Sequence, residues 1–314
     1  MSDVFTIGFL TAVLAAGVAS GAAILYAALG EVLAERAGVL NLGVEGMMLM
    51  GALGGFAVCV WTESAWIGVL GACVVGGLMA LIHAVLTISL RANQVVSGLA
   101  LTLFGTGLSA YLGASLVGRP APDSFTKLAI PVLSDIPRVG TILFKQDALV
   151  YLAYIVVPAL WWWVYRTRPG LNLRSVGENP ATADAMGLDV NRIRYRYVIL
   201  GGAFAGLGGA VISLATNPGW TENMTAGRGW IAVALVIFGT WNPARAAAGA
   251  LLFGAIEAAQ FRMQAINVPI SSFFLNMTPY IFTIVVLIIA TRQTRRMRIG
   301  QPAALGVPYV REER

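Results

Sequence analysis

The chain has 314 residues, of which 58% are hydrophobic and 11% charged, and its formal net charge is +6. An ordinary soluble domain carries roughly 25% charged residues, so this composition excludes a fold whose surface mostly faces water. Because about 20 apolar residues cross a bilayer core about 30 Å thick, and helices satisfy their own backbone hydrogen bonds there, helical spans are expected. The sequence therefore predicts an all-α polytopic membrane protein, with residues 1–314 forming one transmembrane domain.

Apolar runs in chain order predict nine transmembrane helices. The seventh is short for a full crossing, so it is tilted, extended or partly re-entrant within the protein. The first five residues contain no Lys or Arg, which argues against a removable signal peptide. The predicted spans are residues 5–29, 38–60, 65–90, 94–117, 147–165, 196–215, 229–242, 246–261 and 272–291.

Positive charges predict the orientation, because short cytoplasmic loops carry an excess of Lys and Arg. Two segments, residues 166–196 and 292–314, hold six arginines each. Both are therefore expected in the cytoplasm of a bacterial cell, which places the N-terminus outside the inner (plasma) membrane and the C-terminus inside. The basic tail is explained by attraction to anionic membrane lipid, and no nucleic acid partner is expected. Its arginines are Arg292, Arg295, Arg296, Arg298, Arg311 and Arg314.

Two loops stand out in this layout. The external segment 118–146 contains four prolines and is either an ordered cap or docking surface, or a passive connector. In the cytoplasmic segment 166–196, Asn179 suits an N-cap, Pro180 the first helical position and Gly187 the C-terminal cap. They predict a helix about 10 Å long at 1.5 Å per residue. This helix either fits a groove on another protein or merely joins two spans.

Polar residues also gather around the start of the second span. Glu31 and Glu35 lie four residues apart, and Arg36 is expected to neutralise one of them. Asn41 is expected to cap a helix starting near Leu42, with Glu45 in its first turn. Glycines then recur every three to five residues and suggest a smooth packing face. The segment fits either a substrate path or close helix packing.

A few further polar residues fall inside predicted spans. Asn93 and Gln94 open the fourth span, and Thr102 follows within it. These three residues, with Asn41 and Glu45, are the candidates for the translocation path. His83 is expected to be a hydrogen-bonded packing residue, whereas Glu257 is either path-facing or paired.

Nucleotide-binding and catalytic motifs are missing from the sequence. It contains only two lysines, neither of which follows a glycine, so it has no Gly-x-x-x-x-Gly-Lys loop for ATP. It also lacks zinc-ligand spacings and a nucleophile elbow. We therefore expect a non-enzymatic subunit that binds no cofactor itself.

Three blocks resemble the permeases of ATP-binding cassette (ABC) importers in the branched-chain amino acid and ribose superfamily, especially the nucleoside or simple-sugar branch. They are GEVLAERAGVLNLGVEGMML (residues 30–49), ANQVVSGLA (92–100) and LRSVGENPATADAMG (173–187). The resemblance runs in the same order from about residue 22 to 290. Gln94 stands where many relatives carry an acidic residue, which argues against solute binding by charge at that position.

The resemblance implies a role for each block. The second span would begin beside the translocation path, and the short cytoplasmic helix would be the coupling helix that fits a groove on the ATPase. The coupling residues would be Glu178, Asn179, Pro180, Ala181, Ala185, Met186 and Gly187.

The resemblance also implies an assembly. The chain is similar to the shorter of two paired permeases, which work with ATPase subunits that bind ATP and Mg²⁺ and with a periplasmic or lipoprotein solute-binding protein. Few fixed charges in the path suit a neutral polar solute, with a nucleoside first, a monosaccharide second and branched-chain amino acids third. A secondary transporter driven by an ion gradient is the alternative of another class.

Overall fold

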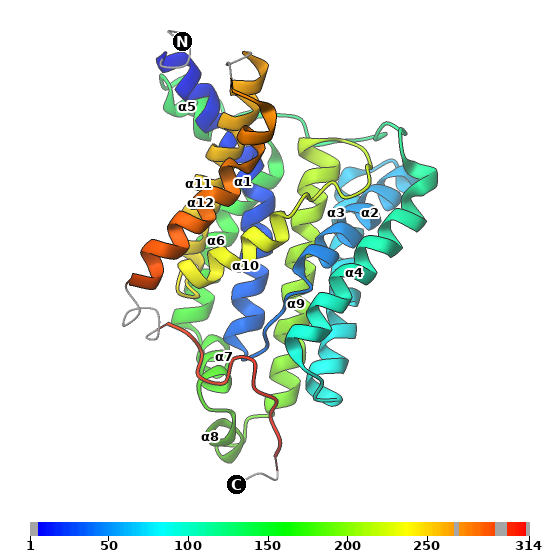
Figure 1. The fold of residues 1–314 in the computed structure, drawn as a ribbon, viewed down its shortest axis with the longest axis vertical. Coiled ribbons are helices and arrows are strands. Elements are labelled where there is room, and N and C mark those ends of the chain that lie inside the picture. Colours follow the sequence, from blue (N-terminus) through cyan, green and yellow to red (C-terminus); the bar gives the residue numbers. More distant parts are fainter. Residues whose placement is uncertain (1–5, 267–269, 293–299, 312–314) are drawn as a thin grey trace.

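The computed structural model of the protein describes residues 6–266, 270–292 and 300–311. Over these residues it is an elongated helical bundle (Figure 1), which confirms the predicted all-α membrane protein. Six helices are long and apolar enough to cross a membrane. They are α1 (Ile7–Arg36), α2 (Val44–Thr62), α3 (Ala65–Ala84, continued by a π-helical turn to Ser89), α4 (Gln94–Gly113, continued by a 3₁₀ turn to Leu116), α6 (Ala148–Arg166) and α9 (Val190–Val211, continued by a π-helical turn to Thr216).

The last three predicted spans look different from these six. Helix α10 (Arg228–Phe238) has 11 residues, so at 1.5 Å per residue it is about 16 Å long, roughly half of a bilayer core. The predicted span 229–242 is therefore not a complete helical crossing. Helix α11 (Pro243–Ala265) is long but less apolar, because it contains charged residues, and α12 (Ser272–Arg292) follows it.

Several helices extend beyond the predicted spans at the end that carries α7 (Arg168–Glu178) and α8 (Pro180–Ala185). Helix α1 continues to Arg36 rather than residue 29, and α9 begins at Val190 rather than residue 196. A hydropathy window stops where charged residues begin, whereas these helices continue past the apolar region. The segment predicted as a loop with one short helix therefore holds two helices and the start of a third.

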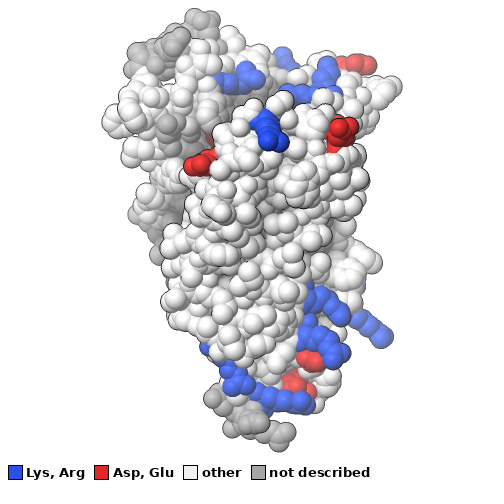
Figure 2. Space-filling view, turned by 90° about the vertical axis from the view of Figure 1, so that its right-hand side faces the viewer, with Lys and Arg blue, Asp and Glu red and all other residues white. Residues whose placement is uncertain are grey.

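Charged side chains gather at the two ends of the bundle and leave a broad uncharged belt between them (Figure 2). Large apolar side chains are exposed on the flanks of the bundle, including Leu103 on α4 and Ile155 on α6, which are 76% and 67% exposed. Such a surface is costly in water and is expected where lipid tails surround the protein. The protein is thus a multi-pass membrane protein.

Close approaches between backbones hold the centre of the bundle together. A Cβ added at Gly51 of α2 would lie 2.3 Å from the Cα of Gly206 on α9. One added at Gly46 would lie 2.7 Å from the carbonyl oxygen of Leu101 on α4, and one at Gly54 would lie 2.7 Å from a Val75 methyl group on α3. The prediction of one smooth glycine face is therefore wrong, since the glycines of α2 admit three neighbouring helices on different sides.

The segment 118–146, which the charges predict to be external, is an ordered cap. It contains a short helix, α5 (Val139–Leu143), and an antiparallel pair of strands, β1 (Leu128–Ala129) and β2 (Lys145–Gln146). Asp123 Oδ2 accepts a hydrogen bond from Ala65 N at the start of α3 (2.8 Å), and Gln146 Nε2 donates to Ala15 O of α1 (2.9 Å). These contacts fix the segment on the bundle, whereas its role as a docking surface or a passive connector stays a prediction.

Candidate functional site

The non-helical segment 37–43 joins α1 to α2 inside the bundle, and side chains from α4 satisfy part of its backbone. Leu40 N donates to Gln94 Oε1 (2.7 Å), and Leu42 O accepts from Thr102 Oγ1 (2.9 Å). Gln94 and Thr102 are both buried. Irregular backbone is tolerated at membrane depth where protein groups replace water as partners, and this segment meets that condition.

His83 of α3 completes the support of this segment. Its Nε2 lies 3.0 Å from Leu40 O, and its Nδ1 lies 3.0 Å from Ser97 Oγ. Because a carbonyl oxygen only accepts, Nε2 carries the proton and Nδ1 accepts from the serine. His83 is fully buried, which confirms the predicted packing role.

Asn41 also belongs to this cluster but does not cap the helix as predicted. Its Oδ1 accepts from Gly43 N (3.0 Å), and its backbone N donates to Glu31 Oε1 (3.1 Å). Helix α2 begins at Val44, two residues later than expected, because Asn41 caps a turn that precedes it. The structure thus brings Asn41, Gln94 and Thr102 together around one segment.

The other two candidate path residues lie elsewhere. Asn93 is exposed at the start of α4 and accepts from Val96 N (3.1 Å), an ordinary N-cap. Glu45 is buried and caps the half-helix α10. Its Oε1 accepts from Thr225 Oγ1 (2.5 Å) and Gly227 N (2.9 Å), while its Oε2 accepts from Gly229 N (2.6 Å).

Arg36 does not neutralise a carboxylate of α1, so that prediction is wrong. Its Nε donates to Trp241 O (3.1 Å) and its Nη2 to Tyr165 OH (3.1 Å). The indole N–H of Trp241 in turn donates to Glu35. Glu35 and Arg36 therefore contact Trp241 rather than each other, Glu35 at its indole N–H and Arg36 at its backbone carbonyl.

An ion pair that the sequence did not predict joins α10 to α11. Arg228 Nε donates to Glu257 Oε2 (3.4 Å), Arg228 Nη2 donates to Glu257 Oε1, and the side chains are 13% and 15% exposed. The predicted spans left Arg228 in the loop before residue 229, whereas it is the first residue of α10. Glu257 is therefore paired, and it also lines a cavity.

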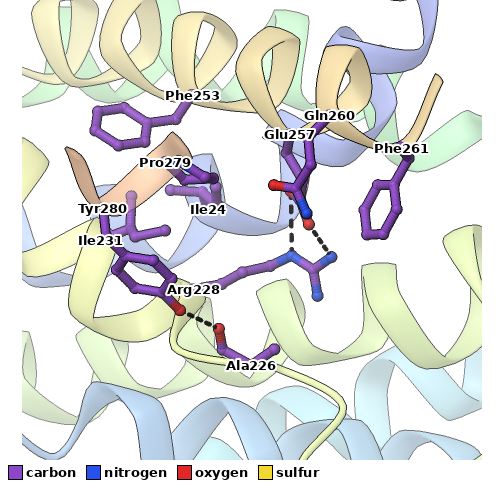
Figure 3. Close-up of a pocket in the computed structure, with 10 residues that line it drawn as sticks. All are labelled: Ile24, Ala226, Arg228, Ile231, Phe253, Glu257, Gln260, Phe261, Pro279 and Tyr280. Atoms are coloured by element: carbon purple, nitrogen blue, oxygen red, sulfur yellow. Dashed lines mark hydrogen bonds and ion pairs between the residues drawn. The ribbon is translucent and has the colours of Figure 1, made fainter. Parts of the chain in front are cut away.

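The ion pair borders a cavity of about 340 Å³. Figure 3 shows that its lining comes from α1, α10, α11 and α12, with Phe253 and Phe261 on either side of the pair. Tyr280 OH donates to Ala226 O (3.1 Å) at its edge.

The predicted cytoplasmic helix is present as α8. Asn179 is its N-cap and accepts from Thr182 N (3.0 Å), and Pro180 is its first residue. Gly187 follows with φ +86°, the left-handed geometry expected of a C-terminal glycine cap. Met186 is 80% exposed. The other exposed residues of this stretch are Glu178, Asn179, Ala181, Thr182, Ala185 and Gly187.

Residues 300–311 pack against α7, α8 and α9, and the attraction of the basic tail to anionic lipid stays a prediction. Ala304 N donates to Gly177 O (2.9 Å), and Arg194 Nη1 donates to Val307 O (3.2 Å). Arg311 Nε pairs with Asp184 Oδ2 of α8 (3.3 Å). The tail arginines Arg295, Arg296, Arg298 and Arg314 lie outside the described residues.

A lipid-facing bundle with a half-helix, a mostly apolar cavity that contains an ion pair, and a capped helix projecting from one end defines a helical membrane transport protein. The chain belongs to the family of permease components of branched-chain amino acid transport systems, whose model matches residues 13–291. It is a transport subunit in that family.

Three curated relatives match nearly the whole chain. A putative glucose ABC transporter permease of Haloferax volcanii is 43% identical, over 97% of this chain and 99% of its own length. A guanosine ABC transporter permease of Bacillus subtilis is 35% identical, over 97% and 98%. A nucleoside ABC transporter permease of Lactococcus lactis subsp. cremoris is 34% identical, over 92% and 94%.

Two of these organisms also hold a second, more distant relative named for the same solute. The one in Haloferax volcanii is 27% identical over 74% of this chain and 65% of its own length. The one in Bacillus subtilis is 22% identical over 88% and 80%.

Proposed function

We propose that this chain is the permease subunit of an ABC importer and forms part of the path for a small neutral polar solute, most simply a nucleoside. The observation that carries the proposal is α8, a capped helix whose exposed Met186 projects from one end of the bundle. Contacts from α7, α9 and residues 300–311 hold this helix in place. A rigid projection of this kind can transmit force from a partner to the bundle.

The partners follow from the same proposal. The ATPase subunit binds ATP and Mg²⁺ and receives α8, while a periplasmic or lipoprotein solute-binding protein docks at the opposite end, where the ordered cap lies. The second permeases of Haloferax volcanii and Bacillus subtilis support a pair of non-identical permeases. In each of these two organisms, this chain corresponds to the permease whose sequence is more similar to its own.

Nine passages through the bilayer fit this assignment. The coil 217–227 together with α10 makes one passage, and α11 and α12 make two more after the six long helices. The start of α1 and residues 300–311 lie at opposite ends of the bundle (Figure 1), as an odd number requires. Arginines of α7 and the start of α9 favour the cytoplasm for the end with α8.

The mechanism is alternating access. ATP binding and hydrolysis shift the bundle only insofar as the ATPase contacts α8 differently in two states of the permease. Segment 37–43 and α10 are the non-helical and half-helical parts of the bundle, so they are the elements best able to rearrange around a solute.

The relatives' names support a nucleoside or a sugar as the solute. Two of the three named above act on guanosine or nucleosides, whereas the one with the highest identity is named for glucose. A monosaccharide is therefore the alternative, and branched-chain amino acids rank third.

The test is Met186→Glu in the complex of this permease with its second permease, ATPase and binding protein. A buried charge at the α8 contact should lower guanosine uptake and transport-coupled ATP hydrolysis about tenfold or more, since coupling energies are typically ~1–3 kcal/mol. Membrane insertion should be normal because Met186 is exposed. Uptake in proteoliposomes and ATPase activity are the measurements.

Val307→Glu is the matched control, since Val307 is an exposed apolar side chain at the same end but outside α8. It should retain uptake. Normal coupled hydrolysis in Met186→Glu would refute the role of α8. Uptake by this chain without any ATPase, driven by an ion gradient, would instead establish the secondary transporter.

A further inference from the structure

The cavity beside the Arg228–Glu257 pair has the size and composition of a ligand site. Its volume of about 340 Å³ lies within the ~300–1,000 Å³ of small-molecule pockets, which are mostly apolar with a few placed polar groups. We propose that this cavity holds the nucleoside during its passage, an inference that rests on the proposed function.

The ion pair supplies the polar groups. A guanidinium has five N–H donors, and Arg228 uses two of them on Glu257 and one on Met224 O (3.1 Å). Among the contacts of the described residues, two N–H groups of Arg228 have no acceptor. Each carboxylate oxygen of Glu257 accepts one hydrogen bond from Arg228 and has a lone pair for another. The pair as a whole is neutral, which suits a neutral ligand with both donors and acceptors.

Aromatic rings flank these polar groups. Phe253 and Phe261 lie eight residues apart on α11 and therefore about 12 Å apart along its axis, with the ion pair between them (Figure 3). Phe253 is 2% exposed and Phe261 is 55% exposed, so one ring lies deep and the other lies at the rim. Nucleobases stack on such rings whatever their identity.

The position in the bundle agrees with this chemistry. Arg228 is the first residue of α10, and Figure 1 shows that this helix begins within the bundle rather than at one of its ends. Solute sites of helical transporters commonly lie where a helix is interrupted near the bilayer midplane. A charged pair at such a depth is costly and is usually retained for function.

The experiment places a photoreactive benzoylphenylalanine at Phe261 in the full transporter complex and illuminates it with tritiated guanosine during ATP-driven transport. The expected result is label on this permease that excess unlabelled guanosine removes. The matched position is Phe274 on α12, which is 67% exposed and does not line the cavity. It should acquire at most a tenth of the label.

A second measurement uses Phe261→Ala and Phe274→Ala. The first should lower the maximal rate of guanosine uptake about tenfold, as loss of one stacking ring predicts, and the second should leave it unchanged. A complex that transports guanosine without labelling at position 261, or with equal labelling at 274, overturns the site but not the importer. A complex that transports glucose and not guanosine overturns the nucleoside assignment, and one that transports nothing with ATP overturns the proposed function itself.

Discussion

Glu45 and Glu257 are two carboxylates that contact the first turn of the same half-helix in different ways. Glu45 is 5% exposed and receives three hydrogen bonds from Thr225, Gly227 and Gly229. Glu257 meets Arg228 beside a cavity, and both partners retain capacity for further hydrogen bonds. The first arrangement is closed to other ligands, whereas the second is open.

The difference separates a carboxylate whose oxygens are all used within the fold from one that keeps room for further hydrogen bonds, although both contact the same element. A backbone N–H at a helix N-terminus has no intrahelical partner, so a carboxylate there satisfies donors that would otherwise be stranded in the membrane. A guanidinium–carboxylate pair has more hydrogen-bonding positions than the two groups use on each other. Substitutions at three places test this contrast: at Glu45, at the Arg228–Glu257 pair and at Thr225.

The largest effect is expected from Glu45→Gln. The amide would direct N–H groups at backbone donors, and each buried donor left without a partner costs about 1–3 kcal/mol. We expect a lower melting temperature in detergent, measured by the loss of the monodisperse peak on heating, together with loss of uptake. Glu222→Gln, an exposed change in the same connecting coil, is the control. Equal melting temperatures for the two variants would contradict the capping role.

A smaller effect on stability is expected when both charged side chains of the Arg228–Glu257 pair are replaced by uncharged ones. Glu257→Gln alone leaves a buried guanidinium without its carboxylate and should destabilise the protein about as strongly as Glu45→Gln. The double variant Arg228→Gln/Glu257→Gln should recover much of the lost thermal stability but not guanosine uptake. Recovery of both would make the pair purely structural, and additive losses of stability would deny that the two groups interact.

The smallest effect is expected from Thr225→Val, which keeps the shape of a fully buried side chain and removes one bond to Glu45. Hydrogen bonds between membrane segments contribute about 1–2 kcal/mol in model peptides. Thermal stability should fall modestly, with the solute affinity of the complex unchanged. A selective loss of guanosine uptake at full stability would move Glu45 into the solute site.

Local features of the sequence predicted local structure well. The long apolar runs became helices because hydropathy alone decides which segments can lie in lipid. The caps of α8 were predictable because Asn179, Pro180 and Gly187 act within their own turn. Helix ends were misplaced where charged residues continue a helix beyond the apolar region, as at Arg36 and Val190.

Contacts between distant residues could not be predicted in this way. Glu45 and Gly227 are 182 residues apart, and Arg228 and Glu257 are 29 apart. Nothing in the sequence near Glu45 indicates that its partner is another helix rather than its own. The presence of Glu257 in an apolar region was a usable signal. Its partner could not be identified, because the predicted spans left Arg228 in the loop before residue 229.

The packing of residues 300–311 has a consequence for biogenesis. Ala303 lies 125 residues after Glu178, to which its backbone N–H donates a hydrogen bond. The ribosome therefore finishes α7 and α8 long before it makes residues 300–311, which pack against them. The end of the bundle that carries α7 and α8 is therefore completed only after α9 to α12 have been synthesised. This order of synthesis delays the final packing of that end until the rest of the bundle is present.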